Sequence, residues 1–233
     1  FFNIKSDHVT FDGSGFTINI AMSGDNINAV GVFRNGGGGS VVQQTQLKND
    51  KTETGYSNIT IKNLNVNVKY GYFFNYEGSL CQRDFGKNAR NVLIDNCHVY
   101  GKIVGSTADS TNILHIGGLV GGHCCNNYKG QGTSVNMTIL NCSSNVTIHG
   151  YNTYCGLLVG SYSARYGGSL IIKNCFTTGT CRSQGNSCGG LLAHGSATYN
   201  GRIYIENCYT LNNIPRYSGG LFGRNVVNPN STL

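Results

Sequence analysis

One short pattern, a strand-like run that ends in Asn-Cys, recurs along the chain and constrains its fold more than any other feature. Four runs share it, "NVLIDNC", "NMTILNC", "SLIIKNC" and "RIYIENC", and a fifth run, "NITIKNL", has Leu in place of Cys. The repeated asparagines are Asn63, Asn96, Asn141, Asn174 and Asn207, at intervals of 33, 45, 33 and 33 residues. Repeats of this length indicate a solenoid, in which each copy buries its apolar face against the next.

A second pattern, a Gly-Leu element, follows each of the four Asn-Cys runs as "GGLVG", "GLLVG", "GGLLA" and "GGLFG". A degenerate first copy, "VTFDGSG" with "AVGVF", precedes the clear ones. The copies tile the chain nearly from end to end, so we expect one domain over residues 1–233. Its expected parts are a degenerate first coil at 7–35, an irregular loop at 34–57, regular coils at 57–224 and a C-terminal tail at 225–233.

Periodicity identifies the repeated unit as a strand, because Ile59, Ile61 and Asn63 recur at every second position. After each asparagine the alternation restarts with the following residue on the inward face. We therefore predict a corner at each repeated asparagine, where inward asparagine side chains stack into a ladder. The next position forms an inward column of small apolar side chains, made of Cys97, Cys142, Cys175 and Cys208.

These features predict an all-β fold, a single-stranded parallel β-helix (β-solenoid) of about six coils with an inward Asn ladder and lateral loops. The Asn-Cys and Gly-Gly-Leu-Val-Gly motifs resemble the right-handed parallel β-helix superfamily and, more narrowly, GLUG-type repeats. The resemblance covers about residues 57–224 and, weakly, 7–35. Such repeats occur in large surface and adhesin-like proteins, so the resemblance implies a place outside a cell or particle, but it implies little about chemistry.

Composition and charge exclude several classes of protein. With 34 Gly, only 2 Pro and 39% hydrophobic residues, the chain is neither collagen-like nor a disordered linker. The net charge of +7 suits anionic glycans or surfaces. No run of four or more basic residues occurs and we expect no nucleic-acid partner. No stretch of 18 apolar residues occurs either, so we expect no membrane span.

Ten cysteines require an account of their own. The inward column favours free, buried thiols, whereas cysteines in loops and at edges are better disulfide candidates. The candidate pairs are Cys155 with Cys188, which are 33 residues apart, and Cys81 with Cys124 or Cys125. Connectivity is not fixed by spacing alone. Because the chain has no Cys-x-x-Cys motif, we expect no metal site, and we expect no cofactor.

Several asparagines match the acceptor pattern for N-linked glycosylation. The candidates are Asn58, Asn136, Asn145 and Asn230. Asn141 also matches, but the repeat assigns it to the inward ladder. Together with the ten cysteines, these matches favour an oxidising setting, either extracellular or at the cell surface, and a virion surface is an alternative.

The predicted function is that of a non-enzymatic structural and adhesive module whose lateral loops contact a protein or a glycan. A polysaccharide lyase or glycoside hydrolase is one alternative, since β-helix enzymes act on polysaccharides. A hydrolase needs two carboxylates about 5–9.5 Å apart. Asp95 and Glu206 share one repeat position, but two copies lie between them, so we predict that they do not form a pair. A viral capsid or fibre component is the second alternative.

Loops and tyrosines are the expected contact surfaces. The loops at 78–90 and 123–135 follow the Gly-Leu element in successive copies, and loops gathered at one corner of a solenoid usually carry function. Tyrosines are dense in the second half, at Tyr151, Tyr154, Tyr162, Tyr166, Tyr199, Tyr204, Tyr209 and Tyr217. Their rings suit sugar stacking or protein contacts. Neither terminus resembles a capping helix, so we also expect a homo-oligomer stacked end to end or a place in a larger assembly.

Overall fold

The computed structural model describes residues 1–21, 28–35, 54–105, 114–130, 134–150, 153–183, 187–214, 218–227 and 232. These residues form sixteen β-strands and no helix. The prediction of an all-β protein is therefore confirmed. Most of the predicted loop at 34–57, and the candidate acceptor Asn230, lie outside the described residues.

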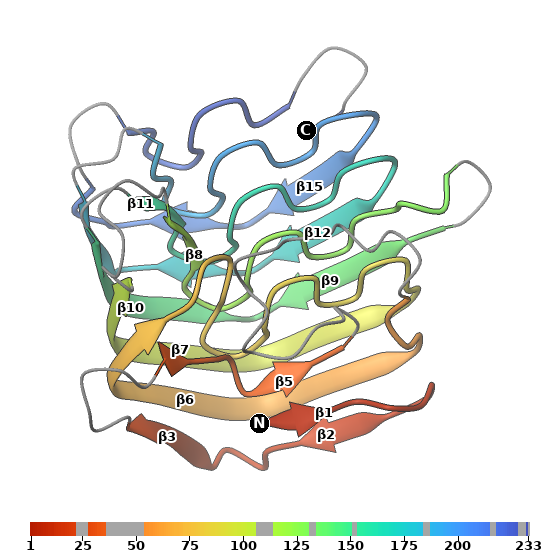
Figure 1. Ribbon diagram of the computed structural model, residues 1–233, viewed down its shortest axis with the longest axis horizontal. Coiled ribbons are helices and arrows are strands. Elements are labelled where there is room, and N and C mark those ends of the chain that lie inside the picture. Colours follow the sequence, from red (N-terminus) through yellow and green to blue (C-terminus); the bar gives the residue numbers. More distant parts are fainter. Residues whose placement is uncertain are drawn as a thin grey trace.

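Short strands come first along the chain and two long strands follow them (Figure 1). The short ones are β1 (Phe2–Asn3), β2 (Thr10–Asp12), β3 (Thr17–Ala21), β4 (Asn28–Ala29) and β5 (Phe33–Arg34). The long ones are β6 (Ile59–Phe73) and β7 (Val92–Gly105). The remaining strands are β8 (Leu114–Gly117), β9 (Asn136–Leu140), β10 (Ser143–Gly150), β11 (Thr153–Gly156), β12 (Ser169–Lys173), β13 (Phe176–Thr177), β14 (Thr180–Ser183), β15 (Arg202–Glu206) and β16 (Tyr209–Thr210).

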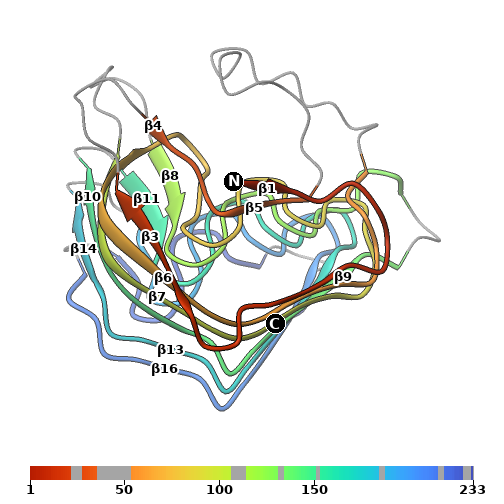
Figure 2. The same cartoon turned by 90° about the horizontal axis from the view of Figure 1, so that it is seen from below.

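All of the pairings between these strands are parallel, and twelve of the strands belong to one sheet. Residues that occupy the same place in consecutive repeats lie side by side, as Ile139, Ile172 and Ile205 do across β9, β12 and β15. The sheet curls into a half-barrel, which Figure 2 shows along the stacking direction. This arrangement is compatible with the predicted parallel β-helix.

The open side of the half-barrel is closed by the Gly-Leu elements, which stack through isolated parallel bridges. One row of bridges joins Val120, Val159, Leu192 and Phe222, and another joins Gly117, Gly156, Gly189 and Gly219. The glycines are required by packing, since a Cβ on Gly117 would collide with the carbonyl oxygen of Val120. The repeated glycine thus lets each turn fold tightly over the core.

The core consists of rows of apolar side chains that point into the curl, one row for each inward position of the repeat. Ile61, Ile94, Ile139 and Ile172 form one such row and are fully buried. Burial of an isoleucine side chain contributes about 1.5–3 kcal/mol, so stacking equivalent residues stabilises every interface between repeats in the same way. The opposite face of β6, β7, β9, β12 and β15 is left to solvent, and it carries the site described next.

Candidate functional site

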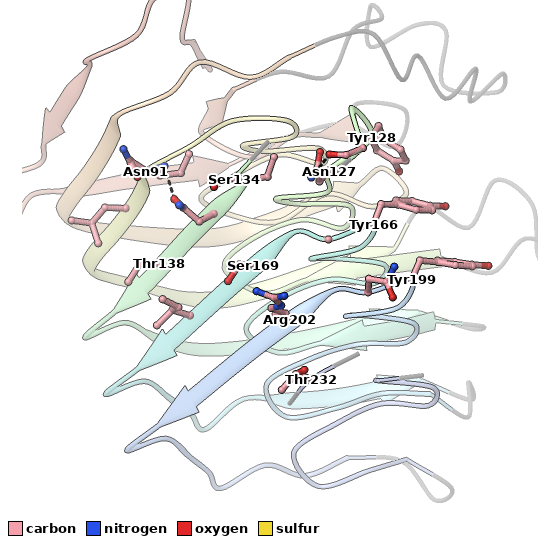
Figure 3. Close-up of a pocket in the computed structure, with 18 of the residues that line it drawn as sticks. Asn91, Asn127, Tyr128, Ser134, Thr138, Tyr166, Ser169, Tyr199, Arg202 and Thr232 are labelled. Carbon is pink, nitrogen blue, oxygen red and sulfur yellow. Dashed lines mark hydrogen bonds between the residues drawn. The ribbon is translucent and has the colours of Figure 1, made fainter. Parts of the chain in front are cut away.

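A groove of about 1530 Å³ runs along the outward face of the sheet, crossing the strands of successive repeats (Figure 3). Three rows of side chains line it. The first row is Thr60, Leu93, Thr138 and Ile171, which are neighbours in the parallel register. The second row is Asn58, Asn91, Asn136, Ser169 and Arg202, and the third is Tyr128, Tyr166 and Tyr199. The rows follow the direction in which the repeats stack, so the groove suits an extended ligand.

The tyrosine row is a stack of rings at one side of the groove. The Tyr128 and Tyr166 ring centroids are 4.9 Å apart, and those of Tyr166 and Tyr199 are 5.0 Å apart with an interplanar angle of 8°. Tyr166 and Tyr199 both have a positive φ, of 59° and 58°, which is uncommon for aromatic residues. Other turn residues of the chain, such as Tyr162 and Ala197, have the same conformation, so the positive φ belongs to the turns that place these rings.

Cations cover part of this tyrosine row. The Arg165 guanidinium lies 4.9 Å from the Tyr166 ring centroid and 4.8 Å from that of Tyr199, and its Nε donates to Thr198 Oγ1. The Lys87 ammonium lies 5.6 Å from the Tyr128 centroid. Cation–π contacts stabilise the stack, and they also occupy ring faces. A ligand in the groove therefore meets ring edges and hydroxyl groups more readily than open ring faces.

Hydrogen bonds from the side chain and the backbone of Asn91 join the asparagines of the second row along the groove. Asn91 Nδ2 donates to Asn58 Oδ1 at 2.9 Å, and the Asn91 backbone N–H donates to Asn136 Oδ1 at 2.5 Å. Asn58 and Asn91 have positive φ values of 57° and 52°, which asparagine tolerates better than most residues. The row thus presents fixed amide groups, and the Arg202 guanidinium continues it.

The candidate glycosylation acceptors fall in two different surroundings. Asn58 and Asn136 line the groove and are half-buried, with hydrogen bonds to the side chain and backbone of Asn91. Asn145 is exposed on β10, outside the groove. Glycosylation stays a prediction for all of them. A sugar on either groove residue would occupy the space that an external ligand would use.

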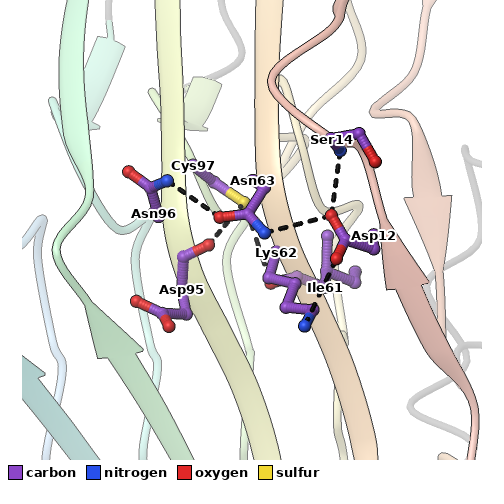
Figure 4. A network of polar contacts seen from close by, with 8 residues as sticks. All are labelled: Asp12, Ser14, Ile61, Lys62, Asn63, Asp95, Asn96 and Cys97. Carbon is purple, nitrogen blue, oxygen red and sulfur yellow. Dashed lines mark hydrogen bonds and ion pairs between the residues drawn. The ribbon is translucent and has the colours of Figure 1, made fainter.

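The repeated asparagines lie at a corner of the repeat outside the groove, and hydrogen bonds join them in two runs. In the first, Asn96 donates to Asn63, which donates to Asp12 Oδ1 at 3.0 Å (Figure 4). In the second, Asn207 donates to Asn174, Asn174 to Asn141, and Asn141 to Asp95 Oδ1. Each run therefore ends on a carboxylate, and the two runs separate where the interval between copies is 45 residues.

The prediction that these asparagines point inward is wrong. Asn96, Asn141, Asn174 and Asn207 are exposed and Asn63 is half-buried. The physical reason is the backbone, because all five asparagines have φ between 49° and 53°. A left-handed residue interrupts the alternation of a strand, so the asparagine side chain turns outward and the following side chain turns inward.

The carboxylate that ends the first run is held by several donors. Asp12 Oδ1 also accepts from the Ser14 backbone N–H at 2.9 Å, and Oδ2 lies 3.3 Å from Lys62 Nζ. The Asn63 hydrogen bond, followed by that of Ser14, holds the pKa of Asp12 below its ordinary value. Asp95 and Glu206 are not partners: Asp95 accepts from Asn141, and Glu206 lies 2.8 Å from Lys173 Nζ.

The residues after these asparagines are in the core. Cys97, Cys142 and Cys175 are buried, Cys208 is half-buried, and all four thiols are free. The backbone N–H of Cys97, Cys142 and Cys175 each lies 3.4 Å from the sulfur of the next cysteine in the column. The column therefore fills the corner of the core with small, weakly hydrogen-bonded sulfur atoms.

Both predicted disulfide pairings are wrong. Cys155 is joined to Cys181 rather than to Cys188, and Cys81, Cys124 and Cys125 are free and buried. Cys181 escaped notice because it does not share the 33-residue spacing of Cys155 and Cys188. Its even offset from Cys175 assigns it to the inward face, and that signal could have identified it as a partner.

A cluster of tyrosine and histidine rings was also missed, in which His115 is buried and the other rings are half-buried. Tyr76 lies 4.6 Å from both His115 and His123, and Tyr162 lies 5.3 Å from His194, as measured between ring centroids. Burial lowers the pKa of His115 and of His123 to about 3. These imidazoles are neutral at neutral pH and pack as flat, largely apolar rings.

A buried carboxylate, Glu77, lies just before the predicted lateral loop at 78–90, and a half-buried one, Asp84, lies within that loop. Burial raises the pKa of Glu77 to about 7 and raises the pKa of Asp84 above its ordinary value. Glu77 Oε2 accepts a 3.4 Å bond from the Gly31 N–H, and Asp84 lies 4.0 Å from Lys87 Nζ. Neither carboxylate lines the groove, and among the described residues that do line it there is no Asp or Glu.

Comparisons with known proteins do not assign the groove a role. No family model, curated protein or solved structure matches the chain. Within the ranges that the structure describes, no helix is long and apolar enough to cross a membrane. The groove is therefore interpreted from its own chemistry.

Proposed function

We propose that this chain is a non-enzymatic β-helical scaffold that binds an extended glycan in the outward groove. The observation that carries the proposal is the pair of parallel rows, tyrosines on one side and asparagines on the other, which follow the stacking direction of the repeats. Parallel strands lie about 4.8 Å apart, so side chains of one row recur at that step. Contacts that recur along a line suit a ligand that is itself a chain of similar units.

The chemistry of the rows favours a ligand rich in hydroxyl groups. Asn91 and Asn136 offer amide donors and acceptors, Thr138 and Ser169 offer hydroxyls, and the tyrosine rings add apolar edges. Sugars present hydroxyl groups and C–H faces together, so they match this mixture. The sequence predicted sugar stacking on the rings, but the contacts with Arg165 direct the ligand toward ring edges.

Positive charge near the groove favours acidic glycans over neutral ones. Arg202 lines the groove and is exposed, and the half-buried Arg165 lies over its tyrosines. Lys87 is buried beside Asp84, so its charge contributes little to the groove. The whole chain carries a net charge of +7, which attracts polyanions from a distance. We therefore propose a uronate- or sulfate-bearing polysaccharide as the ligand.

A non-enzymatic role is supported by where the carboxylates lie. Hydrolysis of a glycosidic bond uses two carboxyl groups that flank the bond. The described lining residues contribute none, and neither the buried Glu77 nor the half-buried Asp84 is among them. Among its described lining residues, the groove thus lacks the carboxylate pair that hydrolysis of a bound chain would use.

The test is binding of defined acidic polysaccharides, measured by isothermal titration, to the natural protein and to matched tyrosine variants. Tyr199→Ala removes a ring from the groove, whereas Tyr209→Ala removes an equally exposed ring that stacks on Phe176 elsewhere. We expect Tyr199→Ala to weaken binding about tenfold and Tyr209→Ala to leave it unchanged. Equal effects of the two variants, or no binding to any polysaccharide, would contradict the proposal.

The proposal also includes a location and a mode of assembly for the protein. The Cys155–Cys181 disulfide supports an extracellular, cell-surface or virion-surface location. Exposed apolar side chains occur toward both ends of the sheet, with Phe16 at 75% exposure and Leu211 at 71%. They favour end-to-end association, which stays a prediction. Sedimentation over a range of concentrations should then show mass rising with concentration.

A further inference from the structure

Three buried cysteine sulfurs gather at one place inside the curl. The sulfurs of Cys155, Cys181 and Cys188 all lie within 4.8 Å of one another. Cys155 and Cys181 form a disulfide, and the free thiol of Cys188 lies 2.8 Å from the Cys181 sulfur. Cys188 Sγ also contacts the Thr153 carbonyl oxygen at 3.3 Å.

The fold explains why three sulfurs meet. Cys155 is in β11, and the Gly189 N–H donates to its carbonyl oxygen at 2.8 Å, which places Cys188 beside it in the next repeat. Cys181 comes from β14, on the adjoining wall of that same repeat, with its side chain buried. The free thiol and the disulfide are therefore held in contact by backbone pairing on both walls.

We propose that these three cysteines form a site of internal thiol–disulfide exchange, in which Cys188 displaces Cys155 from Cys181. The Cys188 thiol gives up its proton and its sulfur attacks Cys181 Sγ. The Cys155–Cys181 bond breaks, the Cys181–Cys188 bond forms, and Cys155 leaves as a thiolate that takes a proton. One disulfide and one thiol are present before and after, so no oxidant or reductant is consumed.

The exchange changes what the cross-link holds together. The Cys155–Cys181 bond spans 26 residues and ties β11 to a strand of the next repeat. A Cys181–Cys188 bond would close only a seven-residue separation within one repeat. Exchange would thus release the covalent tie between neighbouring repeats. A metal ion would require all three sulfurs as thiolates, and the disulfide leaves only one of them.

Burial of the Cys188 thiol slows the exchange. Desolvation raises the pKa of the Cys188 thiol to about 11, so only a small fraction is thiolate at neutral pH. Outside thiols have little access, because all three cysteines are buried. Exchange is therefore slow and internal, and the two bonded forms should coexist in purified protein.

The test is a tryptic map of the native protein under non-reducing conditions, after free thiols have been blocked with a maleimide in acidic denaturant. Cleavage at Lys and Arg puts the three cysteines in separate peptides, 130–165, 174–182 and 183–202. We expect two linked pairs, 130–165 with 174–182 and 174–182 with 183–202, located at these cysteines by fragmentation. A single linked pair, with Cys188 fully labelled after prolonged incubation, would overturn the proposal.

A variant isolates the alternative bond. In Cys155→Ser, unfolded and then refolded in a glutathione redox buffer so that the oxidant reaches the cysteines before they are buried, we expect Cys181 to pair with Cys188. Free thiols at both Cys181 and Cys188, in a variant whose circular dichroism matches that of the natural protein, would overturn the proposal. Cys208→Ser removes a thiol outside the cluster and should leave both linked pairs of the natural protein in place. If Cys155→Ser does not fold, the map of the natural protein decides the question.

Discussion

The side-chain amide of Asn174 donates a 3.1 Å hydrogen bond to the side-chain carbonyl of Asn141, and both residues hold a left-handed backbone. The hydrogen bond depends on the left-handed backbone conformation. The left-handed turn sends the side chain out of the sheet, where the equivalent amide of the neighbouring repeat lies within bonding distance. Asparagine satisfies both demands, since it tolerates this conformation and can donate and accept along the row.

Substitution of Asn174 separates the two contributions. Asn174→Ala loses the hydrogen bonds and strains the backbone, so we expect the free energy of unfolding to fall by about 2 kcal/mol. Asn174→Gly loses the same hydrogen bonds but accepts the positive φ, so its loss should be about 1 kcal/mol smaller. Urea unfolding measures both variants. Equal losses would show that backbone conformation is not what selects asparagine here.

Adjacent glycines in the last Gly-Leu element give a matched pair for the packing of the turns. A Cβ on Gly219 would collide with the Phe222 carbonyl oxygen, whereas a Cβ on Gly220 would meet nothing within 4 Å. We expect Gly219→Ala to destabilise the protein by about 2–3 kcal/mol and Gly220→Ala to have almost no effect. Thermal unfolding of the two variants tests this, and similar melting temperatures would contradict it.

Acid should destabilise the fold through two histidines of the ring cluster, His115 and His123. The pKa of His115 and of His123 is about 3 in the folded state and 6.5 ordinarily. As pH falls below 6.5, these histidines are protonated in the unfolded chain but not in the folded one, so the free energy of unfolding decreases. Glu77 acts oppositely: its folded pKa of about 7 exceeds the ordinary 4.5, so folding is favoured as pH falls from 7 to 4.5.

The three groups give a net slope that can be measured. Each contributes about 1.4 kcal/mol per pH unit, so these three groups by themselves give a net loss of about 1.4 kcal/mol per unit between 6.5 and 4.5. The lowered pKa values of His98, His149 and His194 add to this loss, and the raised pKa of Asp84 opposes it. Urea unfolding at several pH values checks the slope. His123→Phe keeps an aromatic ring and should reduce the loss by about 1.4 kcal/mol per pH unit. Stability that rises on acidification would refute this account.

The charge on Arg202 should discriminate between acidic and neutral polysaccharides. Because Arg202 is exposed, its contribution is modest, about 1 kcal/mol or less, or about fivefold in affinity. We expect Arg202→Gln to weaken binding of an acidic polysaccharide by this factor and to reduce its salt dependence. Arg182→Gln changes an exposed arginine on β14, outside the groove, and serves as the control. An equal loss with both variants would indicate non-specific attraction.

The strand alternation and the repeat interval were enough to predict an all-β protein with equivalent residues side by side. The register of Ile139, Ile172 and Ile205 follows directly from their 33-residue spacing. Alternation failed at the repeated asparagines, because it assumes an unbroken strand. A residue with left-handed backbone conformation points its side chain to the opposite side of the strand. The spacing of apolar residues does not show which residues adopt that conformation.

The groove was only partly accessible from sequence. Tyr166 and Tyr199 are 33 residues apart, as are Asn58 and Asn91, so each pair could have been recognised as a row. Tyr128 lies 38 residues before Tyr166, in a copy with a longer loop, and this offset conceals its place in the stack. The position of Arg165 over the rings depends on the path of a turn, which repeat spacing does not determine.

Register between copies also governs how this molecule can change in evolution. Neighbouring copies contact each other through the same residue positions. Duplication of a 33-residue segment would therefore insert one more repeat that packs against the repeats on both sides of it. Each added repeat would lengthen the groove by one step without new packing. If the groove binds an extended glycan as proposed, the number of copies would set the length of glycan that the protein can hold.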